Sequence, residues 1–203
     1  DWPEAANHPN HPELGSRQIP FCREIYIERD DFREDPPRKF RRLSPGAEVR
    51  LRYAYIIRCE DVIRDASGEI VELRCSYDPD TRSGTRPGQR RVRGTIHWVS
   101  ARHAVRREVR LYERLFLAAN PDQGEGDFKT HLNPQSREIL DDARLEPALA
   151  HAPPQARFQF ERLGYFTVDP GVPERPVFIR TVTLRDSWAK IEHQAARAVG
   201  GGE

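Results

Sequence analysis

Methionine is absent from this 203-residue chain, and lysine nearly so. Lys39, Lys129 and Lys190 are the only lysines among 33 basic residues, so the remaining cations are arginines. A gene rich in G and C produces this bias, yet arginine is also the residue that forks onto guanine edges and stacks on bases. Because even residue 1 is not methionine, we expect a piece of a longer protein, with some activities encoded elsewhere.

Long apolar runs are missing as well. No stretch approaches the roughly 18 apolar residues that a membrane-spanning helix needs, and no signal-peptide pattern opens the chain. Cys22, Cys59 and Cys75 are an odd number at wide spacings, without a C-x-x-C pair. These features predict a cytoplasmic protein with reduced thiols, no membrane partner and no metal site.

The chain also lacks the common catalytic motifs. It contains no glycine-rich phosphate loop, no G-x-S-x-G and no H-E-x-x-H. His97 and His103 flank Ser100, so a serine, histidine and aspartate set can be imagined, but such neighbours arise by chance in a chain that is 32% charged. We therefore predict no catalytic residues and treat binding as the function.

The apolar pattern predicts many short strands. Residues 1–16 read as a linker, residues 18–32 alternate like a half-buried strand, and residues 47–65 and 69–78 form a hairpin around Gly68. Residues 101–116 have a spacing that slightly favours a helix. Phe158, Phe160 and Tyr165 mark the apolar side of a strand over 156–169, and a further strand follows from Pro176. Strands joined by Pro, Gly and Asp turns favour an all-β barrel or sandwich.

Cations gather at three places in the sequence. Arg17 follows a Gly-Ser turn, the apolar-poor loop from Arg82 to Arg93 has five arginines, and the strand RFQFER combines Gln159 with Arg162. The loop ends in RRVRGTIHWVS, which turns at Gly94 and continues as a strand. Alternation places Gln159 opposite the phenylalanines, where its amide suits the edge of an unpaired base. Arginines at 106, 107 and 110 alternate with glutamates and fit an ordinary salt-bridged surface.

Several strings taken together resemble one family. Five stretches carry the resemblance, in this order along the chain: NHPNHPELGSRQIPFCREIYIERDDF, VRLRYAYIIRCEDV, RGTIHWVSARHAVRREVRLYERLF, RFQFERLGYFTVD and PVFIRTVTLRDSWAK. Together they resemble the C-terminal anticodon-binding region of glutaminyl-tRNA synthetase. The similarity runs from about residue 7 to residue 190. GTIHWVSA followed by LYERLF is the most specific part.

The resemblance implies an all-β fold of two six-stranded antiparallel β-barrels, of the type shared with a ribosomal protein that binds 5S RNA, packed together. One barrel would comprise residues 17–36 and 117–190, and the other residues 37–116. Residues 1–16 would link to a missing catalytic part, and residues 191–203 would be a disordered tail. The resemblance also implies extended structure over 101–116, in place of a helix.

The same resemblance assigns the site. Arg17, Gln159 and Arg162 would recognise the middle anticodon base, a uracil. The outer two bases would contact the loop arginines Arg82, Arg90, Arg91 and Arg93. Arg185, in the last strand, would approach the anticodon stem.

The resemblance implies a partnership with glutamine tRNA and with the catalytic domain of the same polypeptide, in a monomer. The parent would be a class I ligase that uses ATP and Mg, but its H-I-G-H and K-M-S-K-S signatures are absent here. This chain would then bind without catalysis and hold no cofactor. The alternatives are the matching region of a eukaryotic-type glutamyl-tRNA synthetase and a non-catalytic ribosomal RNA-binding protein of the same barrel type.

Overall fold

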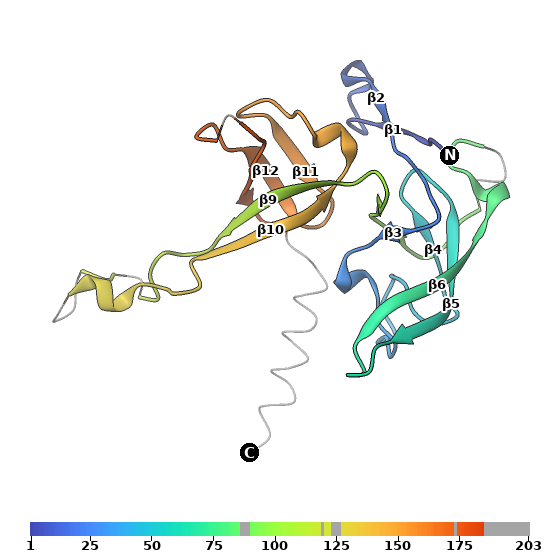
Figure 1. Ribbon diagram of the computed structural model, residues 1–203, viewed down its shortest axis with the longest axis horizontal. Helices are drawn as coiled ribbons and strands as arrows, with labels where there is room; N and C mark the ends of the chain where they lie inside the picture. Colours follow the sequence, from blue (N-terminus) through green and yellow to red (C-terminus); the bar gives the residue numbers. More distant parts are fainter. Residues whose placement is uncertain (86–89, 119, 123–126, 173, 185–203) are drawn as a thin grey trace. The chain divides into compact units, whose positions relative to one another are not determined.

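The computed structural model describes residues 1–85, 90–118, 120–122, 127–172 and 174–184. Within these ranges the chain consists of strands, turns and short 3-10 helices, so the predicted all-β class is confirmed. The strands fall into two compact units (Figure 1). Unit 1 contains residues 1–105 and 144–148, and unit 2 contains residues 106–143 and the described residues from 149 onward. None of the described residues forms a helix long and apolar enough to cross a membrane.

Unit 1 is built on a four-stranded sheet in the order β6-β5-β4-β7. Its strands are β4 (Glu48–Leu51), β5 (Ile56–Arg64), β6 (Ile70–Asp78) and β7 (Thr95–Ile96). The predicted hairpin is confirmed as β5 and β6, which pair antiparallel around a turn in which Gly68 has φ 85°. Alternate side chains of β4 are buried, so Val49 and Leu51 pack with Trp98 in the core of this unit.

A tight turn interrupts the run that sequence periodicity treats as one strand over 47–65. Tyr53 has φ 63°, and the amide of Ala54 donates to the carbonyl of Leu51 at 2.9 Å. Leu51 before the turn and Tyr55 and Ile57 after it are buried as the alternation predicts, but Ala54 and Ile56 are buried as well, so strict alternation ends at the turn. Periodicity therefore located the core residues and missed the chain reversal between β4 and β5.

The first residues of unit 1 form a hairpin. Strand β1 (Glu4–Ala6) pairs antiparallel with β2 (Ser16–Gln18), and η1 (Pro12–Leu14) lies between them. Pro3 and Ala5 are buried, which explains why residues 1–16, predicted to be a linker, fold onto the unit.

The predicted strand over residues 18–32 is much shorter. The strand that lies wholly within this range is β3 (Ile25–Tyr26), which pairs with β8 (Val99–Ser100), while Gln18 ends β2 and Phe32 forms a single β-bridge with Leu43. The 3-10 helix η2 (Arg29–Asp31) follows at once.

Unit 2 carries a five-stranded sheet in the order β10-β9-β13-β12-β11. The strands are β9 (Val105–Tyr112), β10 (Arg137–Leu145), β11 (Arg157–Phe160), β12 (Gly164–Val168) and β13 (Phe178–Val182). The chain crosses between the units within β9 and β10, so Val105 and the last residues of β10 count with unit 1. In Figure 1, β9 and β10 run side by side as a long ribbon toward η5 (Phe128–His131). The helical spacing over 101–116 was misleading, because β9 is a strand, as the family resemblance implied.

The aromatic residues of β11–β13 fill the core of unit 2. Phe160 stacks on Phe166 with ring centroids 4.2 Å apart, and Phe158 and Phe160 both lie near the ring of Phe178. Tyr165 is the exception to the predicted apolar side. The β11–β12 register pairs Tyr165 with Gln159, so its ring lies on the outer face and is 46% exposed.

Two details differ from the barrels implied by the resemblance. The main sheets have four and five strands, β4 with β7 and β13 with β9 pair in parallel, and no sheet closes within the described ranges. The compact units also divide the chain near residues 105, 144 and 148, whereas the resemblance implied boundaries near 37 and 117. The difference arises because residues 17–36 pack in the core of unit 1 through Ile19 and Phe32.

Candidate nucleic-acid interface

Arg17 lies on β2 and is held from several sides. Its Nε and Nη2 donate to the two carboxylate oxygens of Glu146 at 2.5 and 3.0 Å. Its Nη1 donates to the carbonyl oxygen of Ala6 at 3.1 Å and approaches the Asn7 side chain at 3.4 Å. Because a guanidinium has five N–H groups, this set leaves little more than one edge of Nη2 for a ligand. The Arg17 side chain remains 28% exposed.

Glu146 is the residue that sequence reasoning missed at this position. Its side chain is only 11% exposed, and Nε2 of His97 lies 3.3 Å from its Oε1. Burial alone raises the pKa of Glu146, but the hydrogen bonds from His97 and Arg17 outweigh burial and lower the pKa to about 2. Glu146 follows Arg17 by 129 residues, so no local sequence pattern predicts the ion pair between them.

The structure does bring Ser100 and His103 together, with Oγ and Nδ1 2.9 Å apart. Ser100 is only 1% exposed, however, and its hydroxyl also lies 2.9 Å from the sulfur of Cys22. His97 turns instead to Glu146. The hydroxyl of Ser100 is therefore held inside unit 1 by contacts with Cys22 and His103.

The arginine-rich loop begins at a fixed turn. The carboxylate of Asp78 caps η3 (Pro79–Thr81) by accepting the amide of Asp80 at 3.1 Å. The buried hydroxyl of Thr81 donates to the carbonyl of Asp78 and accepts the amide of Ile56 at 2.9 Å. The first residues of the loop are therefore anchored to β5.

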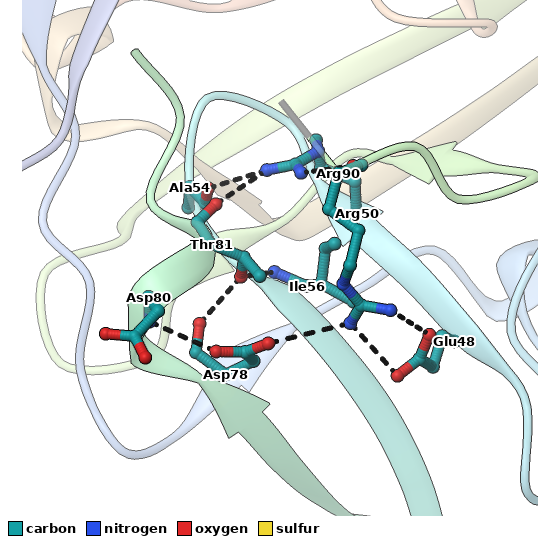
Figure 2. A network of polar contacts seen from close by, with 8 residues as sticks. All are labelled: Glu48, Arg50, Ala54, Ile56, Asp78, Asp80, Thr81 and Arg90. Carbon is teal, nitrogen blue, oxygen red and sulfur yellow. Dashed lines mark hydrogen bonds and ion pairs between the residues drawn. The ribbon is translucent and has the colours of Figure 1, made fainter. Parts of the chain in front are cut away.

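Arg50 of β4 ties the two ends of the loop together. Figure 2 shows its guanidinium beside the carbonyl oxygens of Ala54 and Thr81, and Nη1 donates to that of Thr81 at 2.8 Å. Its Nη2 donates to the carbonyl oxygen of Arg90 at 2.9 Å. Burial lowers the pKa of Arg50, and the charge of Arg90 lowers it further. Nothing in the sequence singles out Arg50, because it occupies an ordinary alternating position in a strand.

Arg90 itself is engaged by acids. It donates from Nη1 and Nη2 to both oxygens of Glu48, at 2.8 and 3.1 Å, and lies 3.6 Å from Asp78 (Figure 2). Arg82 is partly engaged too, 3.7 Å from the carboxylate of Asp1. Arg91 and Arg93 differ: both are exposed, and within the described residues no hydrogen bond or ion pair engages their side chains. Of the loop arginines predicted to contact RNA, these two are the most open to a ligand.

Gly94, between Arg93 and β7, was predicted to form a turn, but the structure gives another reason for a glycine at this position. A Cβ atom built on Gly94 would lie 1.7 Å from the carbonyl oxygen of Arg41. Only glycine permits this approach, so the loop end packs directly against a second segment of unit 1.

Gln159 and Arg162 stand at one end of unit 2. Gln159 is exposed on β11, and the register places it directly opposite Tyr165, so amide and aromatic ring share the outer face. Arg162 lies in the following turn with φ 61°. An amide beside an exposed ring suits an unpaired base, which needs both edge contacts and a stacking surface.

The predicted residues are thus distributed over both units. Arg17, Arg82, Arg90, Arg91 and Arg93 belong to unit 1, and Gln159 and Arg162 belong to unit 2. Arg185 lies outside the described residues. Across the described ranges, no group of three or more His, Cys, Asp or Glu side chains is arranged to hold a metal ion.

Comparison with known proteins identifies the class. Two family models, both described as "tRNA synthetases class I (E and Q), anti-codon binding domain", match residues 1–78 and 95–169. The chain therefore belongs to the anticodon-binding domains of the class I tRNA synthetases for glutamate and glutamine.

Individual relatives narrow this further. Proteins named Glutamine--tRNA ligase from Pseudomonas syringae pv. tomato and Nitrobacter hamburgensis are each 55% identical, over 89% and 93% of this chain. The corresponding protein of Chromobacterium violaceum is 52% identical over 89% of the chain. The matched part is 32%, 33% and 34% of these relatives, so the chain spans about a third of their length.

Proposed function

We propose that this chain is the anticodon-binding region of a glutaminyl-tRNA synthetase and recognises the anticodon of glutamine tRNA. The observation that carries the proposal is the 55% identity to proteins named Glutamine--tRNA ligase over almost the whole chain. Exposed, unpaired arginines and an exposed amide beside an aromatic ring support it, since single-stranded RNA is bound through phosphates, base edges and ring stacking.

In this proposal Arg17, Gln159 and Arg162 contact the middle anticodon base. Arg91 and Arg93 contribute most to the outer bases, because Glu48 occupies Arg90 and Asp1 lies near Arg82. The edge of Arg17 that Glu146 leaves open donates to a base carbonyl. Tyr165 adds a stacking surface beside Gln159.

The activity of the whole protein is part of the proposal. The parent charges glutamine tRNA with glutamine in the cytoplasm, as a monomer, and a catalytic domain of the same polypeptide binds ATP and Mg. The described part of this chain supplies recognition alone. A glutamyl-tRNA synthetase is the second candidate, because the matching family models cover both specificities.

Substitution of the proposed base-reading residues tests the assignment. In filter binding, Arg17→Ala or Gln159→Ala should weaken binding of glutamine tRNA by about 1 to 3 kcal/mol. The same variants should barely affect a tRNA already mismatched at the middle anticodon base, because the contact they remove is absent there. Equal losses on both tRNAs would contradict base reading and leave only phosphate contact. Ser76→Ala, on an exposed face of β6, serves as the control.

A further inference from the structure

A second basic segment of unit 1 lies against the end of the arginine-rich loop. Gly94 approaches the carbonyl oxygen of Arg41 so closely that any side chain on Gly94 would collide with it. Residues 91–93 directly precede this contact, and on the other side it is made by the backbone of Arg41 and Arg42, which Arg38 and Lys39 precede in the chain. Two cationic stretches separated by about fifty residues in sequence are thereby brought next to each other in the fold.

The second segment is a loop with fixed ends. A β-bridge joins Phe32 to Leu43, and the amide of Leu43 donates to the carbonyl of Asp31 at 2.9 Å. Arg42 turns inward, with its Nε 3.3 Å from the buried carboxylate of Asp31. The loop is therefore held at its base, where one arginine is already neutralised.

Three other cations of this loop are exposed to solvent. Arg38, Lys39 and Arg41 are exposed, and no side chain in the described ranges pairs with them. Of the nearby acids, Glu34 is paired with Arg64, and Asp35 lines a hollow together with Ile70.

We propose that these exposed cations form one surface, the 38–93 patch, that binds the sugar-phosphate backbone of the RNA next to the anticodon bases. The patch consists of Arg38, Lys39, Arg41, Arg91 and Arg93. Like charges held close together without counter-ions repel each other, and a polyanion relieves this repulsion. The five patch side chains are cations without a ring or an amide of their own, and the guanidinium of Arg33 lies over the ring of the neighbouring Phe40, 5.7 Å from its centroid. Such cations neutralise phosphates and do not read bases. The inference rests on the proposed function and extends the interface to three residues that the family resemblance did not assign.

Salt dependence of binding tests the patch. Filter binding compares the unsubstituted 203-residue chain with the variant R38A/K39A/R41A at several salt concentrations. The slope of log K against log [salt] is negative, and each lost phosphate contact makes it shallower by about 0.7 to 0.9. The triple variant should therefore have a slope shallower by about 2 to 3. The loss should be the same for glutamine tRNA and for a tRNA mismatched at the middle anticodon base.

The matched control removes three exposed arginines that are each within 4.0 Å of a glutamate: Arg29, Arg58 and Arg74. This control changes the net charge equally and should leave the slope nearly intact. Thermal unfolding monitored by circular dichroism verifies that both variants are folded.

Several results would overturn the proposal. An unchanged slope, an equal fall in the control, or a loss confined to glutamine tRNA would show that the patch does not bind the phosphate backbone. A different outcome would assign the patch to an acidic protein: polyglutamate competes with tRNA for the unsubstituted chain, the triple substitution abolishes this competition, and the salt dependence of tRNA binding stays unchanged. Arg17→Ala and Gln159→Ala distinguish failure of the patch from failure of the proposed function. If these two variants weaken binding of glutamine tRNA as expected and the triple variant has no effect, the patch is wrong and the proposed function stands.

Discussion

At the scale of single residues, Glu146 controls what Arg17 can do. A bidentate carboxylate fixes the plane of the guanidinium and leaves one donor edge exposed, which is how an arginine becomes a directional probe for a base. His97 holds the other side of the same carboxylate. Arg17 was predictable from its place after the Gly-Ser turn, but Glu146 was not, because the pair joins residues far apart in the sequence.

The lowered pKa of Glu146 makes the stability of unit 1 depend on pH. A carboxyl group whose pKa falls from 4.5 to about 2 on folding stabilises the folded chain above its unfolded pKa. This contribution, about 3 kcal/mol in the free energy of unfolding, should be lost as the pH falls from about 5 to about 2.

Glu146→Gln removes the titrating group. The variant should be less stable than the unsubstituted chain at pH 7, and the difference should shrink steadily toward pH 2. Urea unfolding at a series of pH values measures it, with Glu138→Gln, an exposed residue of β10, as the control. A difference that stays constant over this pH range would contradict the account.

At the scale of elements, Arg50 converts a long polar loop into a positioned one. Its guanidinium bonds to carbonyl oxygens at both ends of the loop, next to the ion pair of Arg90 with Glu48 (Figure 2). Arg91 and Arg93 follow closely after Arg90, whose carbonyl oxygen Arg50 binds. The sequence indicated that the loop was functional through its arginines, while the clamp depends on a strand position that looks like any other.

Removal of the clamp should loosen the loop. Arg50→Ala deletes hydrogen bonds to Thr81 and Arg90, so tryptic cleavage between residues 82 and 93 should accelerate several-fold, with a loss of about 1 to 3 kcal/mol in the free energy of unfolding. Mass spectrometry of the digest measures the rate at each site. Arg58→Ala, an exposed neighbour on β5, is the control. Unchanged loop cleavage in a destabilised Arg50→Ala variant would contradict the clamp.

Periodicity located apolar positions more reliably than the limits of the strands. Val49, Leu51, Tyr53, Tyr55 and Ile57 were predicted as one alternating run. All but Tyr53 are buried, and a turn at Tyr53 divides the run into two strands. Over 101–116, helical spacing and β pattern coexisted, and pairing of β9 with β13 decided for a strand. Tyr165 was placed on the wrong face because it was grouped with Phe158 and Phe160, whereas the alternation keeps its phase from β11 to β12 and turns Phe166 inward and Tyr165 outward.

At the scale of the whole molecule, the all-β class and the family followed from the sequence, but the division into compact units did not. Ile19 and Phe32 join the core of unit 1, and the chain passes between the units within β9 and β10. Such long-range packing leaves no periodic signal. Of the proposed base-reading residues, Arg17 belongs to unit 1 and Gln159 and Arg162 belong to unit 2.

The affinity of the chain for tRNAs that differ only in the anticodon tests the central claim most directly. The chain should bind glutamine tRNA more tightly than the same tRNA with its middle uracil replaced, by about 1 to 3 kcal/mol at fixed salt, as is typical for one mismatched base. A glutamate tRNA should also bind more weakly. Equal affinity for all three tRNAs, or tighter binding of the glutamate tRNA, would contradict recognition of the glutamine anticodon by this chain.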